Sequence, residues 1–257
     1  MSASTIDPRN AAFLAEMGIT PLWQMRAASQ PLADAVPADF DPVLPADPAL
    51  PAETPVEADI GAMDWRTLNN AIAACERCGC KNNKEGAGAK KAIAGDGARS
   101  AVWMVVAGAT TVQDEAERQP LAGAPGKLLA NMLKAVQLSR EENVYVTNLV
   151  KCRLTSAGGG ERAPTADEVQ ACRPFVEREL ALCGAGVVLT LGQVATNALL
   201  EQPLSAPLAE SRGKVQQFGG AALVATLHPA ELLQRGPDKA LAWADLCLAR
   251  ATHGQPQ

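Results

Sequence analysis

Four cysteines are the residues of this sequence whose type and spacing are best suited to chemistry. Cys75 and Cys78 are separated by two residues, and Cys152 and Cys172 follow far along the chain. A close pair of thiolates with two distant ones is typical of a tetrahedral zinc site or a 4Fe–4S cluster. Cysteines buried as small apolar side chains give the same pattern by chance. Spacing alone therefore leaves three alternatives: zinc, iron–sulfur or buried thiols.

Three further cysteines, Cys80, Cys183 and Cys247, bring the count to seven. Cys80 is an alternative to Cys78 as a ligand, because a single intervening residue disfavours both serving together. The odd count, and a polar start with no secretory segment, argue against a disulfide framework and for a reducing compartment. No apolar run approaches the roughly 18 residues of a membrane helix. We therefore expect a cytoplasmic protein that makes no membrane contact.

Short buried strands alternate with amphipathic helices in the elements that must position these residues. Strands are predicted from the apolar runs at 101–106, 144–150, 187–191 and 222–226. Helices are predicted from about residue 64, and at 126–136, 165–182, 193–200, 230–234 and 238–251. This alternation predicts an α/β fold, a three-layer αβα sandwich with a mostly parallel central sheet. Functional residues should lie at the carboxyl ends of its strands.

The first 59 residues differ in composition from the rest. They hold nine of the 28 acids and two of the 23 bases, a net charge of −7, which leaves +2 on the remainder and permits DNA contact there. Residues 30–59 contain seven prolines and no Lys or Arg, which predicts an extended, disordered linker. The predicted organisation is a docking peptide at 1–29, the linker at 30–59, a globular domain at 60–252 and a tail at 253–257.

The first 29 residues contain a short predicted helix with apolar anchors. Asp7 and Pro8 are typical of a helix start, and Gly18 of a helix end. A helix of about nine residues is not stable alone in water, so it must pack on something. It is either an extra element packed on its own domain or a tethered peptide that docks into a partner, and we favour the second. Its expected anchors are Phe13, Leu14, Met17, Ile19, Leu22 and Trp23.

Three motifs occupy the predicted strand ends and a following helix: T-N-L-V-K-C-R around Asn148, A-C-R-P around Cys172, and H-P-A-E-L-L from His228. Together they resemble the family 4 uracil-DNA glycosylases over about residues 68–250. The resemblance implies the αβα sandwich of that family and favours iron–sulfur over zinc. The 4Fe–4S ligands that it implies are Cys75, Cys78, Cys152 and Cys172.

The resemblance also implies roles for two residues at the strand ends. In that family an asparagine amide reads the edge of a uracil flipped out of the DNA, and a histidine stabilises the departing uracil anion while water adds at the sugar. Asn148 and His228 match these two positions. Each also has a structural interpretation, because an asparagine at a strand end caps turns and a histidine before proline bonds to the backbone.

The loop after the first predicted strand departs from the family pattern. Relatives carry G-E-A-P-G, an acidic pair and G-x-P-F-V-G, whereas this chain reads A-G-A-T-T, D-E and R-Q-P-L-A-G. Gly108 stands in place of the carboxylate, and Leu121 in place of the ring that stacks on uracil. Thr110 and Thr111 stand in place of proline and glycine, and a β-branched residue disfavours the backbone angles reserved for glycine.

These departures predict a loss of catalysis. Losing a positioned acid or base typically removes about 10²- to 10⁴-fold in rate, and losing a base–aromatic stack costs roughly 1 to 3 kcal/mol. Asp114 and Glu115, the acidic pair, are candidates to orient a water in place of the lost carboxylate. We expect a retained scaffold with a degenerate active site.

A second resemblance lies in the N-terminal segment. Residues 17–26 read M-G-I-T-P-L-W-Q-M-R, similar to the L-G-I-T-x-W-x-L-R segment that opens the psi subunit of bacterial DNA polymerase III, with one extra residue before the tryptophan. Psi has a glycosylase-like fold without catalysis. Its opening peptide binds the clamp-loader collar, and its body binds the chi subunit.

Both resemblances together imply a non-catalytic, psi-like subunit of the clamp-loader complex that acts in DNA replication at the bacterial nucleoid. Its partners would be the clamp-loader collar, formed by the tau and gamma subunits, through 1–29, and the chi subunit through the globular domain, with a structural iron–sulfur cluster. The alternative is an active, divergent family 4 uracil-DNA glycosylase of base-excision repair that uses Asn148 and His228.

Overall fold

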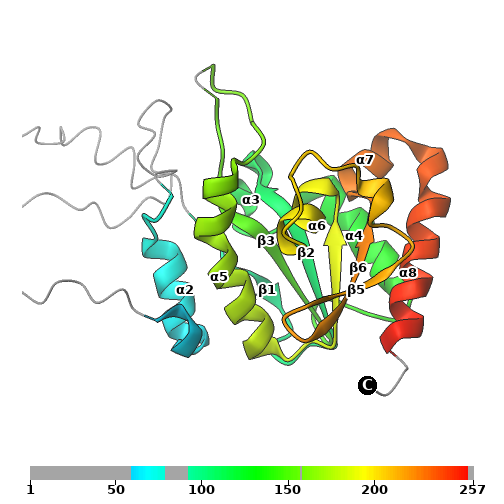
Figure 1. Cartoon of the computed structure of the whole chain (residues 1–257), viewed down its shortest axis with the longest axis horizontal. Coiled ribbons are helices and arrows are strands. Elements are labelled where there is room, and N and C mark those ends of the chain that lie inside the picture. Colours follow the sequence, from blue (N-terminus) through cyan, green and yellow to red (C-terminus); the bar gives the residue numbers. More distant parts are fainter. Residues whose placement is uncertain (1–58, 79–91, 157, 254–257) are drawn as a thin grey trace, which may run out of the picture. The chain divides into compact units, whose positions relative to one another are not determined.

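A mixed six-stranded sheet, in the order β1-β3-β2-β4-β6-β5, runs through the computed structural model, which describes residues 59–78, 92–156 and 158–253 (Figure 1). Its strands are β1 (Asp96–Gly97), β2 (Trp103–Thr110), β3 (Val144–Arg153), β4 (Val187–Leu191), β5 (Val215–Phe218) and β6 (Ala221–Thr226). The four central strands are parallel, and the edge strands β1 and β5 are antiparallel to their neighbours. The predicted fold class is therefore confirmed, with two edge strands that the apolar pattern missed.

Helices cover both faces of this sheet. They are α2 (Trp65–Ala74), α3 (Val112–Glu117), α4 (Gly123–Ala135), α5 (Ala166–Cys183), α6 (Gln193–Leu199), α7 (Pro229–Gln234) and α8 (Lys239–His253), with 3₁₀ turns at Ile60–Ala62, Leu208–Glu210 and Gly236–Asp238. One face packs on α5 and α6, and the other on α4 and α8 (Figure 1). The three predicted layers are present.

Strand β2 illustrates why the sheet needs a cover on each face. Met104 and Val106 pack into the core beneath α5 and α6, whereas Trp103 and Val105 pack beneath α4 and α8. Alternate side chains of a strand point to opposite faces, so a strand that is apolar throughout must be buried on both. The apolar composition of β2 therefore explains why this strand lies inside the sheet, with helices covering both of its faces.

Local caps set where the main helices begin and end. The carboxylate of Asp64 accepts a hydrogen bond from the Thr67 backbone N–H at 2.8 Å and so starts α2. A capping box starts α5, because Thr165 and Glu168 each accept the other's backbone N–H. Gly184, in the left-handed conformation, ends α5.

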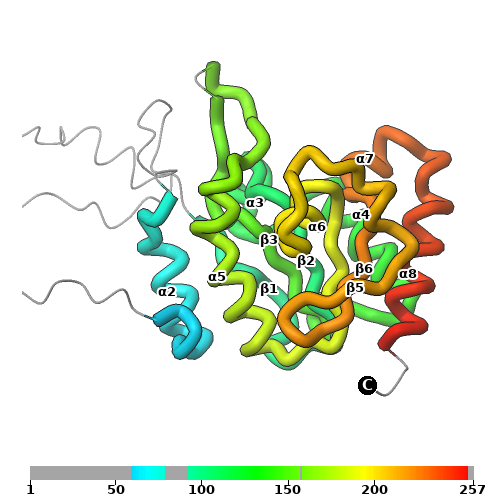
Figure 2. Tube along the Cα trace, in the orientation of Figure 1, coloured from blue at the N-terminus to red at the C-terminus, as the bar shows by residue number. Residues whose placement is uncertain are grey.

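Several expectations fall on residues outside the described ranges. They are the docking peptide at 1–29 with its anchors, nearly all of the linker, Cys80 and the end of the tail. Figure 2 shows the connection between β3 and α5 projecting beyond the carboxyl ends of the strands. Within the described ranges, no helix combines the length and apolar character needed to span a membrane.

Candidate active site

The carboxyl ends of the parallel strands gather the residues predicted to act on a ligand. Asn148 lies in β3 opposite Ala107 of β2, which ends shortly afterwards at Thr110. His228 follows the last residue of β6 by two positions and starts α7. The side chain of Asn148 is 1% exposed, so it faces the interior of the site.

Asp114 and Thr110 hold the amide of Asn148. The Asn148 Nδ2 group donates to Oδ2 of Asp114 at 3.0 Å and to Oγ1 of Thr110 at 3.2 Å. The Asn148 Oδ1 atom is buried and has no hydrogen-bond partner among the described residues. A buried acceptor without a partner is rare and marks a place where a ligand group can donate.

Asp114 reaches this site from α3, a helix that the sequence pattern did not predict. Thr111 caps α3 and forms a capping box with Asp114. The carboxylate of Asp114 also accepts the backbone N–H of Ala122 at 2.7 Å and that of Thr111 at 3.0 Å. Thr111 has φ −97° and ψ 170°, so its backbone is extended, and the expectation that threonine would be strained there is wrong.

Glu115, the other member of the acidic pair, points elsewhere. Its Oε2 pairs with Nε of Arg153 at 2.5 Å, at the end of β3. Of the two acids named from the sequence, Asp114 therefore contacts Asn148, whereas Glu115 forms an ion pair with Arg153.

His228 is fixed in one tautomer by the helix that it starts. Its Nδ1 accepts the backbone N–H of Ala230 at 3.2 Å, which leaves Nε2 to carry the ring proton. Burial lowers the pKa of His228, and the charge of Asp114 acts in the opposite direction. Gly192 packs against the ring, because a Cβ there would lie 3.1 Å from the His228 Cβ. The histidine is a neutral donor at neutral pH.

Gly108 and Leu121 are two of the four positions where the chain departs from the family pattern, and Gly108 lies within β2 whereas Leu121 precedes α4. A Cβ at Gly108 would lie 3.8 Å from the Val194 Cβ, so ordinary packing does not require the glycine. Leu121 is buried with a left-handed φ of 51°, a strained conformation for a bulky residue. Gly126 of α4 supports it, because a Cβ there would collide with the Leu121 carbonyl oxygen.

Comparison with known proteins points to one family. The sequence model of the Uracil DNA glycosylase superfamily matches residues 94–247. The chain is 28% identical over 179 residues to the Type-4 uracil-DNA glycosylase of Pyrobaculum aerophilum, which covers 67% of this chain and 86% of that protein. It is 32% identical over 156 residues to that of Saccharolobus solfataricus, which covers 58% of this chain and 69% of that protein. This chain belongs to the uracil-DNA glycosylase superfamily.

The expectation of a non-catalytic, psi-like replication subunit is therefore wrong. The superfamily relatives carry the name of an enzyme, and a third, from Archaeoglobus fulgidus, is 30% identical over 170 residues, 64% of this chain and 80% of that protein. None of these matches supports the psi resemblance of residues 17–26. That expectation considered only the residues that the loop lacks. The altered loop still places Asp114 in hydrogen-bond contact with Asn148.

The superfamily domain brings some of the four predicted cluster ligands together. Cys172 and Cys78 are in hydrogen-bond contact, and this contact, with burial, raises the pKa of the Cys172 thiol. Cys152 lies in the same buried cluster of side chains, whereas Cys75 packs with residues around Phe175. No disulfide joins the described cysteines.

The four thiols fit an iron–sulfur cluster in donor type but do not close around one. Thiolates are the ligands that such clusters require. Over residues 59–78, 92–156 and 158–253, no three metal-ligating side chains meet at one point. The cluster therefore remains a prediction from the sequence resemblance.

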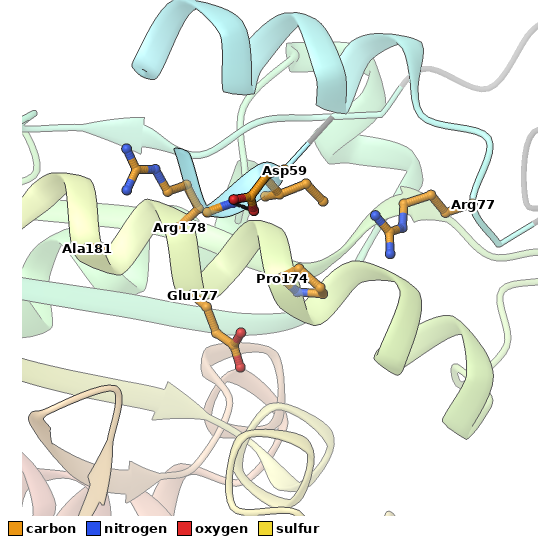
Figure 3. A pocket seen from close by; sticks show the side chains of 8 residues that line it. Asp59, Arg77, Pro174, Glu177, Arg178 and Ala181 are labelled. Carbon is orange, nitrogen blue, oxygen red and sulfur yellow. Dashed lines mark hydrogen bonds between the residues drawn. The ribbon is translucent and has the colours of Figure 1, made fainter. Parts of the chain in front are cut away.

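A cavity of about 580 Å³ lies away from these strand ends. Figure 3 shows it between the start of the domain at Asp59 and the outer surface of α5, with Arg77 and Arg178 around it. None of the strand-end residues discussed above lines this cavity. We therefore assign the candidate active site to the polar groups at the strand ends and not to this cavity.

Proposed function

We propose that this protein is an active type-4 uracil-DNA glycosylase that removes uracil from DNA in base-excision repair. The observation that carries the proposal is the cluster of Asn148, Asp114 and His228 at one edge of a superfamily domain. An amide acceptor and a neutral imidazole donor are the two groups needed to hold a uracil and to stabilise it as it leaves. DNA is the only partner that this function requires.

Asn148 is proposed to read the flipped-out base. Its Oδ1 is a buried acceptor without a protein partner, and uracil presents an N3–H donor on its Watson–Crick edge. A site built to pair with such a donor discriminates strongly against a base that lacks it, because its own buried group would stay unpaired. Uracil would complete the hydrogen bonding of the site.

His228 is proposed to stabilise the leaving group. In the hydrolysis the C1′–N1 bond breaks, and its electron pair passes to the uracil ring and O2. A water oxygen bonds to C1′, one water proton is released, and the uracil anion takes up a proton from solvent. A neutral Nε2–H that points at O2 strengthens its hydrogen bond as negative charge develops, which lowers the barrier.

Gly108 is the main departure from the relatives in this mechanism. No side chain at this position can hold the attacking water, so we propose that stabilisation of the leaving uracil supplies most of the rate enhancement. Asp114 contributes by orienting Asn148 and by placing a negative charge near the positive charge that develops on the sugar.

The function is tested by uracil release from a single-stranded oligonucleotide with one central uracil, followed by alkaline cleavage at the abasic site. We expect strand cleavage to depend on enzyme, and an oligonucleotide with cytosine in place of uracil to resist it, because cytosine has no N3–H to donate to Asn148 Oδ1. Asn148→Ala should remove release from the uracil strand. An enzyme preparation that leaves the uracil strand intact at stoichiometric concentration would overturn the proposal.

The proposed 4Fe–4S cluster is tested separately from activity. Anaerobically purified protein should be brown, with the visible absorbance of an iron–sulfur protein, and should contain about four irons per chain. Cys172→Ser should reduce the iron content, whereas Cys247→Ser, which alters an exposed cysteine on α8, should not. A colourless preparation that contains zinc would contradict the iron–sulfur prediction.

A further inference from the structure

Thr110 lies where the relatives carry a proline, and its hydroxyl contacts the amide proposed to read the base. We propose that Thr110 is a positioning residue that, together with Asp114, fixes the Asn148 amide with only its oxygen facing the substrate. The Asn148 amide would then select a base only through an N–H donor on the ring of that base, and it would make no second hydrogen bond to the base. This inference rests on the proposed function and deepens it.

Both protons of the Asn148 amide are already engaged. A primary amide nitrogen carries two protons, and Nδ2 donates one to Oγ1 of Thr110 at 3.2 Å and one to Oδ2 of Asp114 at 3.0 Å. No amide proton is left for a carbonyl oxygen of the base. Oδ1 is the one polar atom of this side chain that a ligand can use.

The chemistry of the two partners determines which way the amide points. The Thr110 hydroxyl gives its single proton to the Val150 carbonyl oxygen at 3.0 Å, so it can only accept from Asn148. The Asp114 carboxylate accepts two backbone N–H groups besides the amide and has no proton to give. A reversed amide would set Oδ1 against two acceptors, so the orientation with Nδ2 inward is the stable one.

Proline could not take the place of Thr110 in this arrangement. It has no side-chain oxygen, so one amide proton of Asn148 would stay available to the substrate. Thr110 is 2% exposed, and its hydroxyl is enclosed by β2 and β3. With Thr110 at this position, the Asn148 amide has only its Oδ1 acceptor left for the base.

This arrangement of the Asn148 amide predicts which bases the site accepts. Uracil carries N3–H and can pair with Oδ1, whereas cytosine carries a lone pair at N3 and would place an acceptor against an acceptor. Methylation at N3 removes the donor and should abolish recognition in the same way. Modification at the O4 carbonyl should matter much less, because no amide proton remains to bind it.

Thr110→Val tests this inference, since valine has nearly the shape of threonine but no hydroxyl. We expect kcat for uracil release to fall about tenfold, the contribution of one hydrogen bond, with KM for DNA within about twofold. Thr110→Ser keeps the hydroxyl and should restore kcat to within about twofold. The preference for free uracil over 3-methyluracil as an inhibitor should be large in the wild type and the serine variant, and smaller in the valine variant.

The outcomes separate this inference from the proposed function. If the wild-type protein releases no uracil, the proposed function fails, and binding of uracil and 3-methyluracil measured by calorimetry then decides the inference alone. If the wild type binds neither base, or both equally, the inference is overturned. It is also overturned if Thr110→Val matches the wild type in kcat and base preference. Thr110→Ala repeats the measurement if thermal unfolding shows that the valine variant does not fold.

Discussion

Replacing His228 with alanine should lower kcat for uracil release by about 10²- to 10³-fold, the usual cost of removing one donor to a developing oxyanion. The Ala230 N–H holds Nδ1 at 3.2 Å, so Nε2 carries the ring proton, and in the proposed mechanism this N–H donates to O2 of the uracil. Because the hydrogen bond to O2 strengthens only as the anion forms, the loss should fall on kcat and leave KM for DNA within a fewfold.

The pH dependence of kcat/KM is a second test of the role proposed for His228. Burial lowers the pKa of His228 below the ordinary 6.5, so the neutral donor should persist as the pH falls through that value. We expect kcat/KM to stay level from neutral pH down through 6.5 and to fall only at lower pH. The unfolded chain takes up a proton on this imidazole near 6.5 and the folded chain does not, so His228 should also lower stability as the pH falls.

His253 provides the matched control, since it is an exposed histidine in the last turn of α8. His253→Ala should leave both kcat and the pH profile unchanged. A His228→Ala enzyme with wild-type kcat, or a pH profile that breaks at or above 6.5, would contradict the role assigned to the ring.

The sequence predicted the four central strands of the sheet, and there is a physical reason for this. Central parallel strands are buried on both faces and therefore read as continuous apolar runs, as β4 and β6 do. The edge strands β1 and β5 are short and partly exposed, with little composition to mark them. A strand buried on both faces can be recognised from its apolar residues, whereas an edge strand is defined by its pairing with a neighbouring strand, which its own residues do not show.

The candidate site was predicted only in part. Asn148 and His228 were proposed as site residues because their motifs resemble those of relatives, whereas α3 was not predicted although T-V-Q-D, from Thr111 to Asp114, is a capping-box pattern. Six residues are too few for a periodic apolar face, so the helix gave no other signal. The structure was needed to see that this turn carries Asp114 to Asn148.

A second feature that the sequence hid is a buried ion pair between β3 and α5. Lys151 lies at the end of an apolar run, and Glu179 lies in an amphipathic helix, where a charged residue normally faces solvent. The side chains of Lys151 and Glu179 are 2% and 0% exposed, and Nζ lies 2.6 Å from Oε2. Only the fold brings together residues so far apart in the chain.

Replacing Lys151 with methionine should destabilise the protein by about 3 to 5 kcal/mol, because it leaves a buried carboxylate without its counter-charge. Thr147 donates to Glu179 Oε2 at 2.9 Å, and Tyr145 and the Gly95 N–H donate to Oε1 at 3.3 and 3.1 Å. Burial and the adjacent carboxylate raise the pKa of Tyr145, so its hydroxyl keeps its proton and remains a donor. These neutral donors solvate the charge but cannot neutralise it.

Urea unfolding of three variants separates the pair from its surroundings. Lys151→Met should lose most, whereas the double variant Lys151→Met with Glu179→Leu should recover much of the loss, since an apolar pair can replace a buried ion pair. Glu177→Gln, two residues away on α5, removes a 48% exposed partner of Arg173 and should cost less than about 1 kcal/mol. Equal losses for Glu177→Gln and Lys151→Met would refute the buried-pair argument.

The pair also connects the two elements that carry half of the predicted cluster ligands. Lys151 directly precedes Cys152 in β3, and Glu179 lies two helical turns beyond Cys172 in α5. Breaking the pair therefore loosens the packing that brings these two thiols into one buried cluster. Lys151→Met should consequently lower the iron content of the purified protein along with its stability, and the double variant should restore both.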